Sequence, residues 1–93
     1  MAANPVVIVL AKDTWVKVAT GVLTGMILRM STAPEKYSQT YRLTTGTAPT
    51  DDSDSVNIFV NKQTINQSAI SSDVAIDVYI KARGAAGKVR VDL

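Results

Sequence analysis

The last twenty residues of the chain carry the pattern that most constrains its fold. Apolar and polar side chains alternate over 74–82, and the alternation resumes after 83–87, a segment with two glycines. Successive side chains of a strand point to opposite faces of a sheet, so the pattern predicts two half-buried strands. We expect a C-terminal β-hairpin with Ile80 opposite Val89 or Val91, because a one-residue slip would turn the apolar row to water. The row expected in the core comprises Val74, Ile76, Val78, Ile80, Ala82, Val89, Val91 and Leu93.

Side-chain composition favours an all-β protein. Twelve valines and seven isoleucines outnumber five leucines, and there are ten threonines. Branching at Cβ costs χ1 freedom in a helix and suits a pleated surface. The 93 residues make one domain, 1–93, with 1–5 as a loose tail. Only 19% of the residues are charged, against roughly 25% in typical soluble domains, which favours a chain that covers part of its surface with a partner.

Turn-forming residues divide the rest of the chain into short segments. Residues 71–73 predict the turn that precedes the terminal hairpin. Residues 21–30 fit either an amphipathic helix or a strand, and two glycines and two threonines in 20–25 make the strand the favoured interpretation. Further strands are expected at 6–10, 14–19, 37–44, 56–60 and 63–66. The whole is typical of a small antiparallel β-sandwich or barrel of about seven or eight short strands.

The unbroken apolar run 6–10 differs from the alternating strands. It predicts a strand that is buried on both faces or covered by a neighbouring subunit. We therefore expect an oligomer, with 6–10 or 26–30 at the subunit contact. A few hundred Å² of exposed apolar strand, at ~25 cal/mol per Å², would favour association by several kcal/mol.

Missing residue types argue against several functions. The chain has no histidine and no cysteine, so Ser–His and Cys–His nucleophiles and the usual zinc ligands are absent. We expect no enzyme and no cofactor. The absence of disulfides fits a reducing compartment or assembly inside a cell. No apolar stretch approaches the ~20 residues that cross a bilayer, so we expect a soluble chain without a membrane partner.

Three carboxylates cluster at Asp51, Asp52 and Asp54. The spacing fails the calcium loop of an EF-hand, because no glycine stands at its turn position and Gln63 stands where that loop has its glutamate. A solvated loop tip is the favoured interpretation, and a cation site stays the alternative.

Two sets of residues are candidates for binding a partner. Strand geometry would place Lys81, Arg83, Lys88 and Arg90 in one basic patch on the terminal hairpin. The patch is either a solvated edge that discourages aggregation or a docking surface for an acidic partner. Nucleic acid is disfavoured, since aromatic residues are sparse beside the patch and acidic residues share the small domain. The aromatic residues are core and interface anchors or, alternatively, a platform for sugar; they are Trp15, Tyr37, Tyr41 and Tyr79.

Several strand and turn segments share their pattern with a known group of proteins: TWVKVA at 14–19, YSQTYR at 37–42, APTDD at 48–52, IDVYI at 76–80 and VRVDL at 89–93. In these segments the chain resembles small all-β virion proteins of tailed bacteriophages, which decorate or cement the capsid or attach to the head or tail. The resemblance implies a β-sandwich in the virion, assembled in the host cytoplasm. It also implies a homo-oligomer, often a trimer, that binds the major capsid protein or another virion protein. The alternatives from other classes are a carbohydrate-binding β-sandwich module and a nucleic-acid-binding β-barrel.

Overall fold

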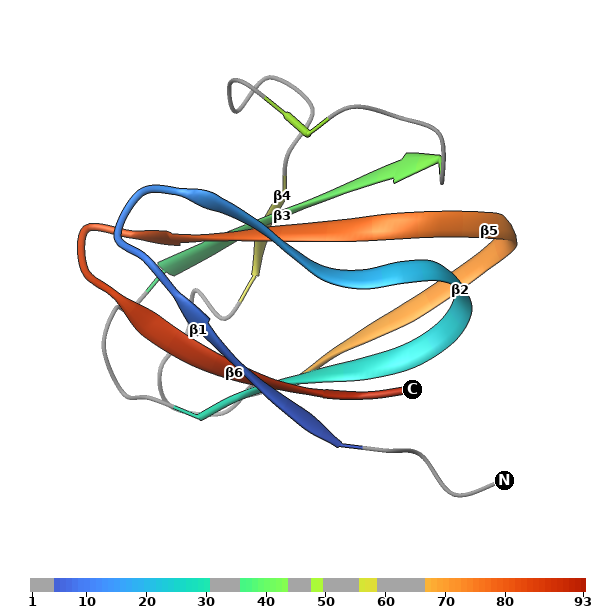
Figure 1. Ribbon diagram of the computed structural model, residues 1–93, viewed down its shortest axis with the longest axis horizontal. Helices are drawn as coiled ribbons and strands as arrows, with labels where there is room; N and C mark the ends of the chain where they lie inside the picture. Colours follow the sequence, from blue (N-terminus) through green and yellow to red (C-terminus); the bar gives the residue numbers. More distant parts are fainter. Residues whose placement is uncertain (1–4, 31–35, 44–47, 50–55, 59–66) are drawn as a thin grey trace.

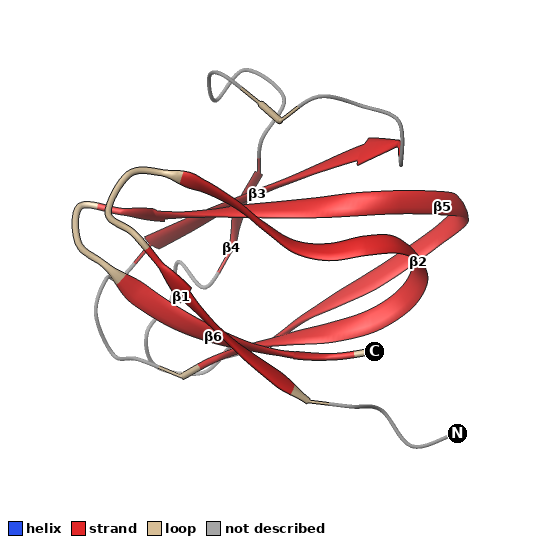
Figure 2. Cartoon of the chain, viewed as in Figure 1, coloured by secondary structure: helices blue, strands red, loops and turns tan. Residues whose placement is uncertain are grey.

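The computed structural model describes residues 5–30, 36–43, 48–49, 56–58 and 67–93, and this part of the chain is all-β (Figures 1 and 2). Six strands form one antiparallel sheet in the order β1-β6-β2-β5-β3-β4. The strand favoured for 21–30 is confirmed over 21–29. The strands are β1 (Val6–Leu10), β2 (Trp15–Arg29), β3 (Lys36–Leu43), β4 (Val56–Ile58), β5 (Gln67–Arg83) and β6 (Gly87–Asp92).

Two long strands, β2 and β5, run through the sheet and bend together (Figure 1). Their pairing passes from Val22 opposite Ile76 to Thr24 opposite Ser71. Residues 72–75 of β5 therefore stand against the single residue Leu23 of β2, and the three extra residues form a bulge, a feature that bends a strand and increases its twist. On β2 the backbone of Gly21 adopts a positive φ of 61°. The bend turns the sheet back over itself, with β3 and β4 beside one half of β5 and β6 and β1 beside the far half of β2.

The folded sheet encloses one apolar core, built from β1, β2, β5 and β6. Most of the apolar row expected from the alternation lies in it, so this prediction is confirmed for the buried members. It is wrong for Val74, which is 55% exposed, and for Leu93, which is 49% exposed. Val74 lies in the bulge, where the alternation is interrupted, and Leu93 follows the last residue of β6. The core comprises Leu10, Val18, Ala19, Ile27, Ile70, Ile76, Val78, Ile80, Ala82, Val89 and Val91.

The terminal strands do not form the expected hairpin. In the sheet β6 lies between β1 and β2, whereas β5 lies between β2 and β3. Ile80 and Val89 nevertheless belong to the same core, both fully buried. Alternation determines which face of a strand is buried. That face can be covered by a strand that lies across the core, so alternation does not require the next strand of the chain to pair beside it. Residues 84–86 therefore carry the chain from one half of the folded sheet to the other.

The turn expected at 71–73 is also wrong, because these residues lie inside β5. The Ser72 hydroxyl donates to the carbonyl oxygen of Val74 at 2.7 Å and accepts the N–H of Val74 at 3.2 Å. Such local bonds compete with a regular ladder. Here both bonds lie within the bulge of β5, and the strand continues through it.

Six strands are described rather than seven or eight. The expected strand 63–66, the end of 56–60 and the first four residues of the tail 1–5 lie outside the described residues. In the part of the chain that is described, no helix is long and apolar enough to cross a membrane.

Two connections meet at one end of the molecule (Figure 1). Asp13, between β1 and β2, has a positive φ of 52°, and its N–H donates to the carbonyl oxygen of Ala82 at 2.7 Å. Its carboxylate accepts the N–H of Gly84 at 2.9 Å, where the β5–β6 connection also has a positive φ. Asp13 therefore ties together the two segments that cross between the halves of the sheet.

Candidate functional site

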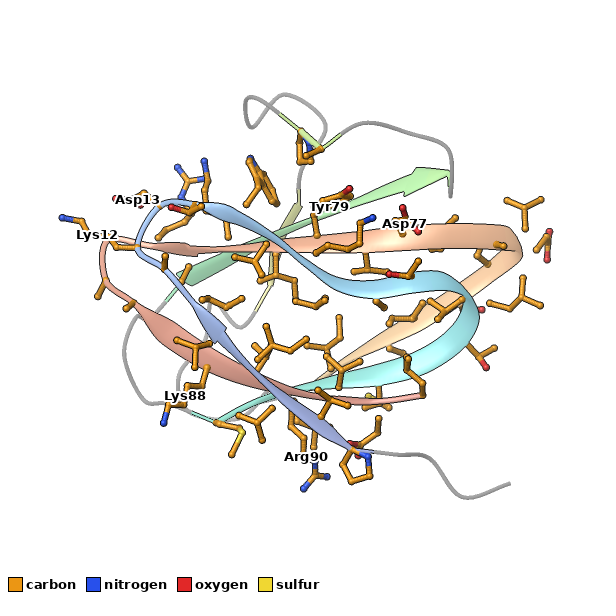
Figure 3. The ribbon with its side chains drawn as sticks, in the orientation of Figure 1. Lys12, Asp13, Asp77, Tyr79, Lys88 and Arg90 are labelled. Carbon is orange, nitrogen blue, oxygen red and sulfur yellow. The ribbon has the colours of Figure 1, made fainter. Side chains whose placement is uncertain are left out.

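The four basic residues expected in one patch are not brought together. Lys81 and Arg83 alternate with core residues of β5, and Lys88 and Arg90 alternate with core residues of β6. Both strands turn their apolar rows toward the same core, so the basic rows lie on opposite outer faces. Figure 3 places Lys88 and Arg90 on the side of the molecule away from Tyr79 of β5. The expectation of one patch failed because it depended on the hairpin.

The outer face of β1, β6 and β2 combines apolar and basic side chains. Val7 lies opposite Arg90 and Val9 opposite Lys88, while Leu28 lies opposite Arg90 from the other side. Directly opposite residues share a face of a sheet, so the basic row of β6 lies between two apolar rows. The N–H of Met30 donates to the Lys88 carbonyl oxygen at 3.1 Å, which extends the row of β2. This outer face comprises Val7, Val9, Met26, Leu28, Met30, Lys88, Arg90 and Asp92.

One of its positive charges is compensated within β6. Nε and Nη2 of Arg90 donate to the two carboxylate oxygens of Asp92 at 3.0 and 2.9 Å. These hydrogen bonds, and then the charge of Asp92, raise the pKa of Arg90. Lys88 therefore contributes most of the net positive charge of the row.

Strand β1 is the edge of this face, because no strand of the described part pairs with its other side. Val6 and Val7 are each 51% exposed and Val9 is 64% exposed, so the run 6–10 is not buried on both faces within the chain. Natural edge strands are commonly protected by charge, proline or a bulge. β1 has none of these within its five residues.

The second outer face, on β2 and β5, pairs lysines with aromatic rings. Trp15 lies opposite Lys81 and Lys17 opposite Tyr79. The Lys81 Nζ lies 5.1 Å from the centroid of the Trp15 ring, and the Lys17 Nζ lies 5.8 Å from that of Tyr79. Both distances are those of cation–π contacts.

The strand register places the four aromatic positions in two different rows. Tyr37 and Tyr41 of β3 lie opposite Ala82 and Val78, two residues of the core-facing row. Trp15 and Tyr79 belong to the outer row, and Tyr79 is only 5% exposed. The register therefore separates the four positions that the sugar-binding interpretation would combine.

Sequence reasoning missed Asp77, which is fully buried although it stands in the polar row of β5 (Figure 3). Its Oδ1 accepts the N–H of Gly21 at 3.0 Å, and its Oδ2 lies 3.4 Å from the Nζ of Lys17. The Asp77 carboxylate, by hydrogen bonding and then by its charge, raises the pKa of Lys17. Gly21 is distant in sequence, so no spacing could have indicated this contact. The arrangement holds the β2 backbone at its bend.

Within the described ranges, no three His, Cys, Asp or Glu side chains gather closely enough to bind a metal ion. The carboxylates at 51, 52 and 54 lie outside those ranges.

Comparison with known proteins identifies no relative: no protein-family model matches the chain, and neither a curated protein nor a solved structure is significantly similar to it. The features that indicate a function are therefore the two outer faces and the β1 edge.

Proposed function

We propose that the chain is a non-enzymatic structural protein of a phage particle, which binds the capsid as an oligomer and stabilises or decorates it. The observation that carries the proposal is the exposed valine strand β1 beside the basic row of β6. The partner is the major capsid protein or another virion protein, and the protein is located in the virion after assembly in the host cytoplasm.

Exposed apolar surface supports a partner rather than a free monomer. Val7 and Val9 share the outer face of β1 and are 51% and 64% exposed, and Val6, on the opposite row, is 51% exposed as well. Burial of a few hundred Å² of such surface contributes several kcal/mol at ~25 cal/mol per Å². Patches of this size often mark interaction sites.

Charge supports an acidic partner surface for the outer face of β1, β6 and β2. Lys88 is exposed at the middle of that face, between Val9 on β1 and the Met30 end of β2. A rim charge of this kind mainly accelerates and orients association, while the apolar rows supply the buried area.

The proposal includes a β-sandwich of seven or eight strands. Six described strands and one enclosed core support it. The additional strand would come from the expected segment 63–66.

The carbohydrate alternative is less well supported. Tyr79 is nearly covered, and the Trp15 ring already has the Lys81 ammonium near its centroid. A sugar platform needs open ring faces to stack on. Nucleic acid is disfavoured too, because the basic residues lie on opposite faces of the domain.

Mass spectrometry of purified particles of the source phage tests the proposal. We expect the protein in mature virions at many copies per particle, alongside the major capsid protein. The proposal would be overturned if the protein were absent from mature virions, or if its gene lay in a genome that contains no phage genes.

A further inference from the structure

We infer that the free edge of β1 binds the same edge of a second copy, antiparallel across a two-fold axis at Ile8. This inference deepens the proposed oligomer, and it rests on the proposed function only for its biological setting. The pairing itself is a property of the purified chain.

The accessible edge of β1 is short and has defined ends. Val6, Val7 and Val9 are at least half exposed, whereas Leu10 is fully buried. Pro5, which precedes the strand, has no N–H to donate. An added strand centred on Ile8 therefore pairs chiefly with the backbone of residues 7–9, since Val6 would lie opposite the buried Leu10.

The chemistry of β1 is nearly palindromic about Ile8. In an antiparallel pair centred there, Val7 of each copy lies opposite Val9 of the other, and Ile8 lies opposite itself. Opposed residues share a face, so the exposed valines of the outer face cover one another. An axis at Val7 would place Val9 opposite Pro5, which lacks a donor. Ile8 is therefore the better centre.

A second copy is the occupant that the sequence of β1 fits, because its valine row is self-complementary and carries no charge. β1 has no charged side chain. In the two-fold pair its residues lie opposite those of an identical strand, so no charge is brought into the contact from either copy. Edge pairing of this kind supplies backbone hydrogen bonds, while alternate side chains supply specificity. A closed two-fold pair uses the same edge on both subunits and leaves neither exposed.

The competing self-association is head-to-tail, with β1 of one copy against β4 at the other end of the next copy's sheet. That contact could close a ring, such as the trimer implied by the resemblance. In the described part of the chain β4 has three residues, against five in β1, and so offers a shorter match. The two-fold pair makes a dimer and joins the outer faces of two copies into one continuous surface.

Charged variants of the purified chain test both the contact and its register. We expect light scattering and sedimentation to give twice the chain mass of 9.9 kDa at micromolar concentration. Val7→Glu or Val9→Lys alone should weaken the dimer about tenfold or more, because each places a charge opposite a valine. An equimolar mixture of the two variants should restore association. In a mixed dimer the introduced glutamate faces the introduced lysine, and the remaining Val9 faces the remaining Val7.

Val74→Lys is the matched control, because Val74 is 55% exposed on β5 and lies outside the proposed contact. It should dimerise like the unmodified chain. Circular dichroism and the melting temperature establish that each variant folds. A monomer at ~100 µM, a trimer, or a mixture no stronger than either variant alone would each overturn the inference. None of these outcomes bears on whether the protein is present in virions, which the particle analysis decides separately.

Discussion

At the scale of single residues, Asp77 joins parts of the molecule that are distant in sequence. Its carboxylate binds the N–H of Gly21 and lies beside the ammonium of Lys17. A buried carboxylate needs such partners, because an unpaired one costs several kcal/mol. Gly21 supplies the positive φ that β2 needs at its bend, and Asp77 satisfies the N–H that the bend exposes.

The Lys17–Asp77 pair predicts a loss of stability in strong base. The pKa of Lys17 is raised in the folded state, so its contribution is fully present below the unfolded pKa of about 10.4 and is lost as pH rises through the higher folded pKa. Urea denaturation at pH 9 to 12 checks this. The midpoint should fall more steeply with pH in the unmodified chain than in Lys17→Met, and parallel curves would contradict the role of the pair.

Lys88 tests whether the outer face of β1, β6 and β2 docks on the particle. Lys88→Glu should weaken binding to the phage particle at low salt, and the defect should shrink at high salt, because charges are screened over about 8–10 Å at physiological ionic strength. Arg83→Glu makes the same change of charge on the opposite outer face and should bind nearly as the unmodified chain does. Co-sedimentation with particles, with melting temperatures measured in parallel, separates the two. Equal defects would place the docking surface elsewhere.

At the scale of elements, β5 contributes to both halves of the folded sheet. Its C-terminal half, 76–83, pairs with β3 and with the first half of β2. Its N-terminal end, 67–71, pairs with the last residues of β2, on the other side of the bulge. From Ile76 to Ala82 every second residue faces the core. Within the bulge at 72–75 this alternation is interrupted, and Val74 is exposed. Neighbours in one apparent apolar row therefore have different environments.

Ile80→Asp and Val74→Asp test that difference directly. Ile80 is fully buried, so an aspartate there buries an unpaired charge, and the cost of several kcal/mol is comparable with a total stability of roughly 5–15 kcal/mol. Val74 is half exposed, and its substitution should change stability by less than about 1 kcal/mol. Chemical denaturation measures both. Ile80→Asp with an unchanged midpoint would mean that the core face is assigned wrongly.

At the scale of the whole molecule, the two connections held by Asp13 decide how the sheet closes. The β1–β2 and β5–β6 segments both pass between the halves of the sheet, and Asp13 bonds to the backbone of Ala82 and Gly84. Its positive φ is one that aspartate and asparagine tolerate better than most residues.

Asp13→Ala should destabilise the domain by about 1–2 kcal/mol, through a lost hydrogen bond and a strained backbone. For a chain of this length that is a fall in melting temperature of roughly 4–16 °C. Asp13→Asn keeps a side-chain acceptor and the tolerance of positive φ, so it should lose much less. Thermal unfolding followed by circular dichroism compares them, and equal losses in both variants would argue against the backbone bonds as the cause.

The sequence by itself determined strand content and the buried faces, because both depend on local properties. Branching at Cβ favours strands. The two-residue period identifies alternate residues as core residues, namely Ile76, Val78, Ile80, Ala82, Val89 and Val91. Neighbouring strands, the bend and the charge pattern were decided only by the tertiary structure. A strand's period is the same whether its apolar row meets a strand beside it or across the core, so the hairpin and the single basic patch were wrong together. The contact of Asp77 with Gly21 depends on how the sheet closes, which no local pattern encodes.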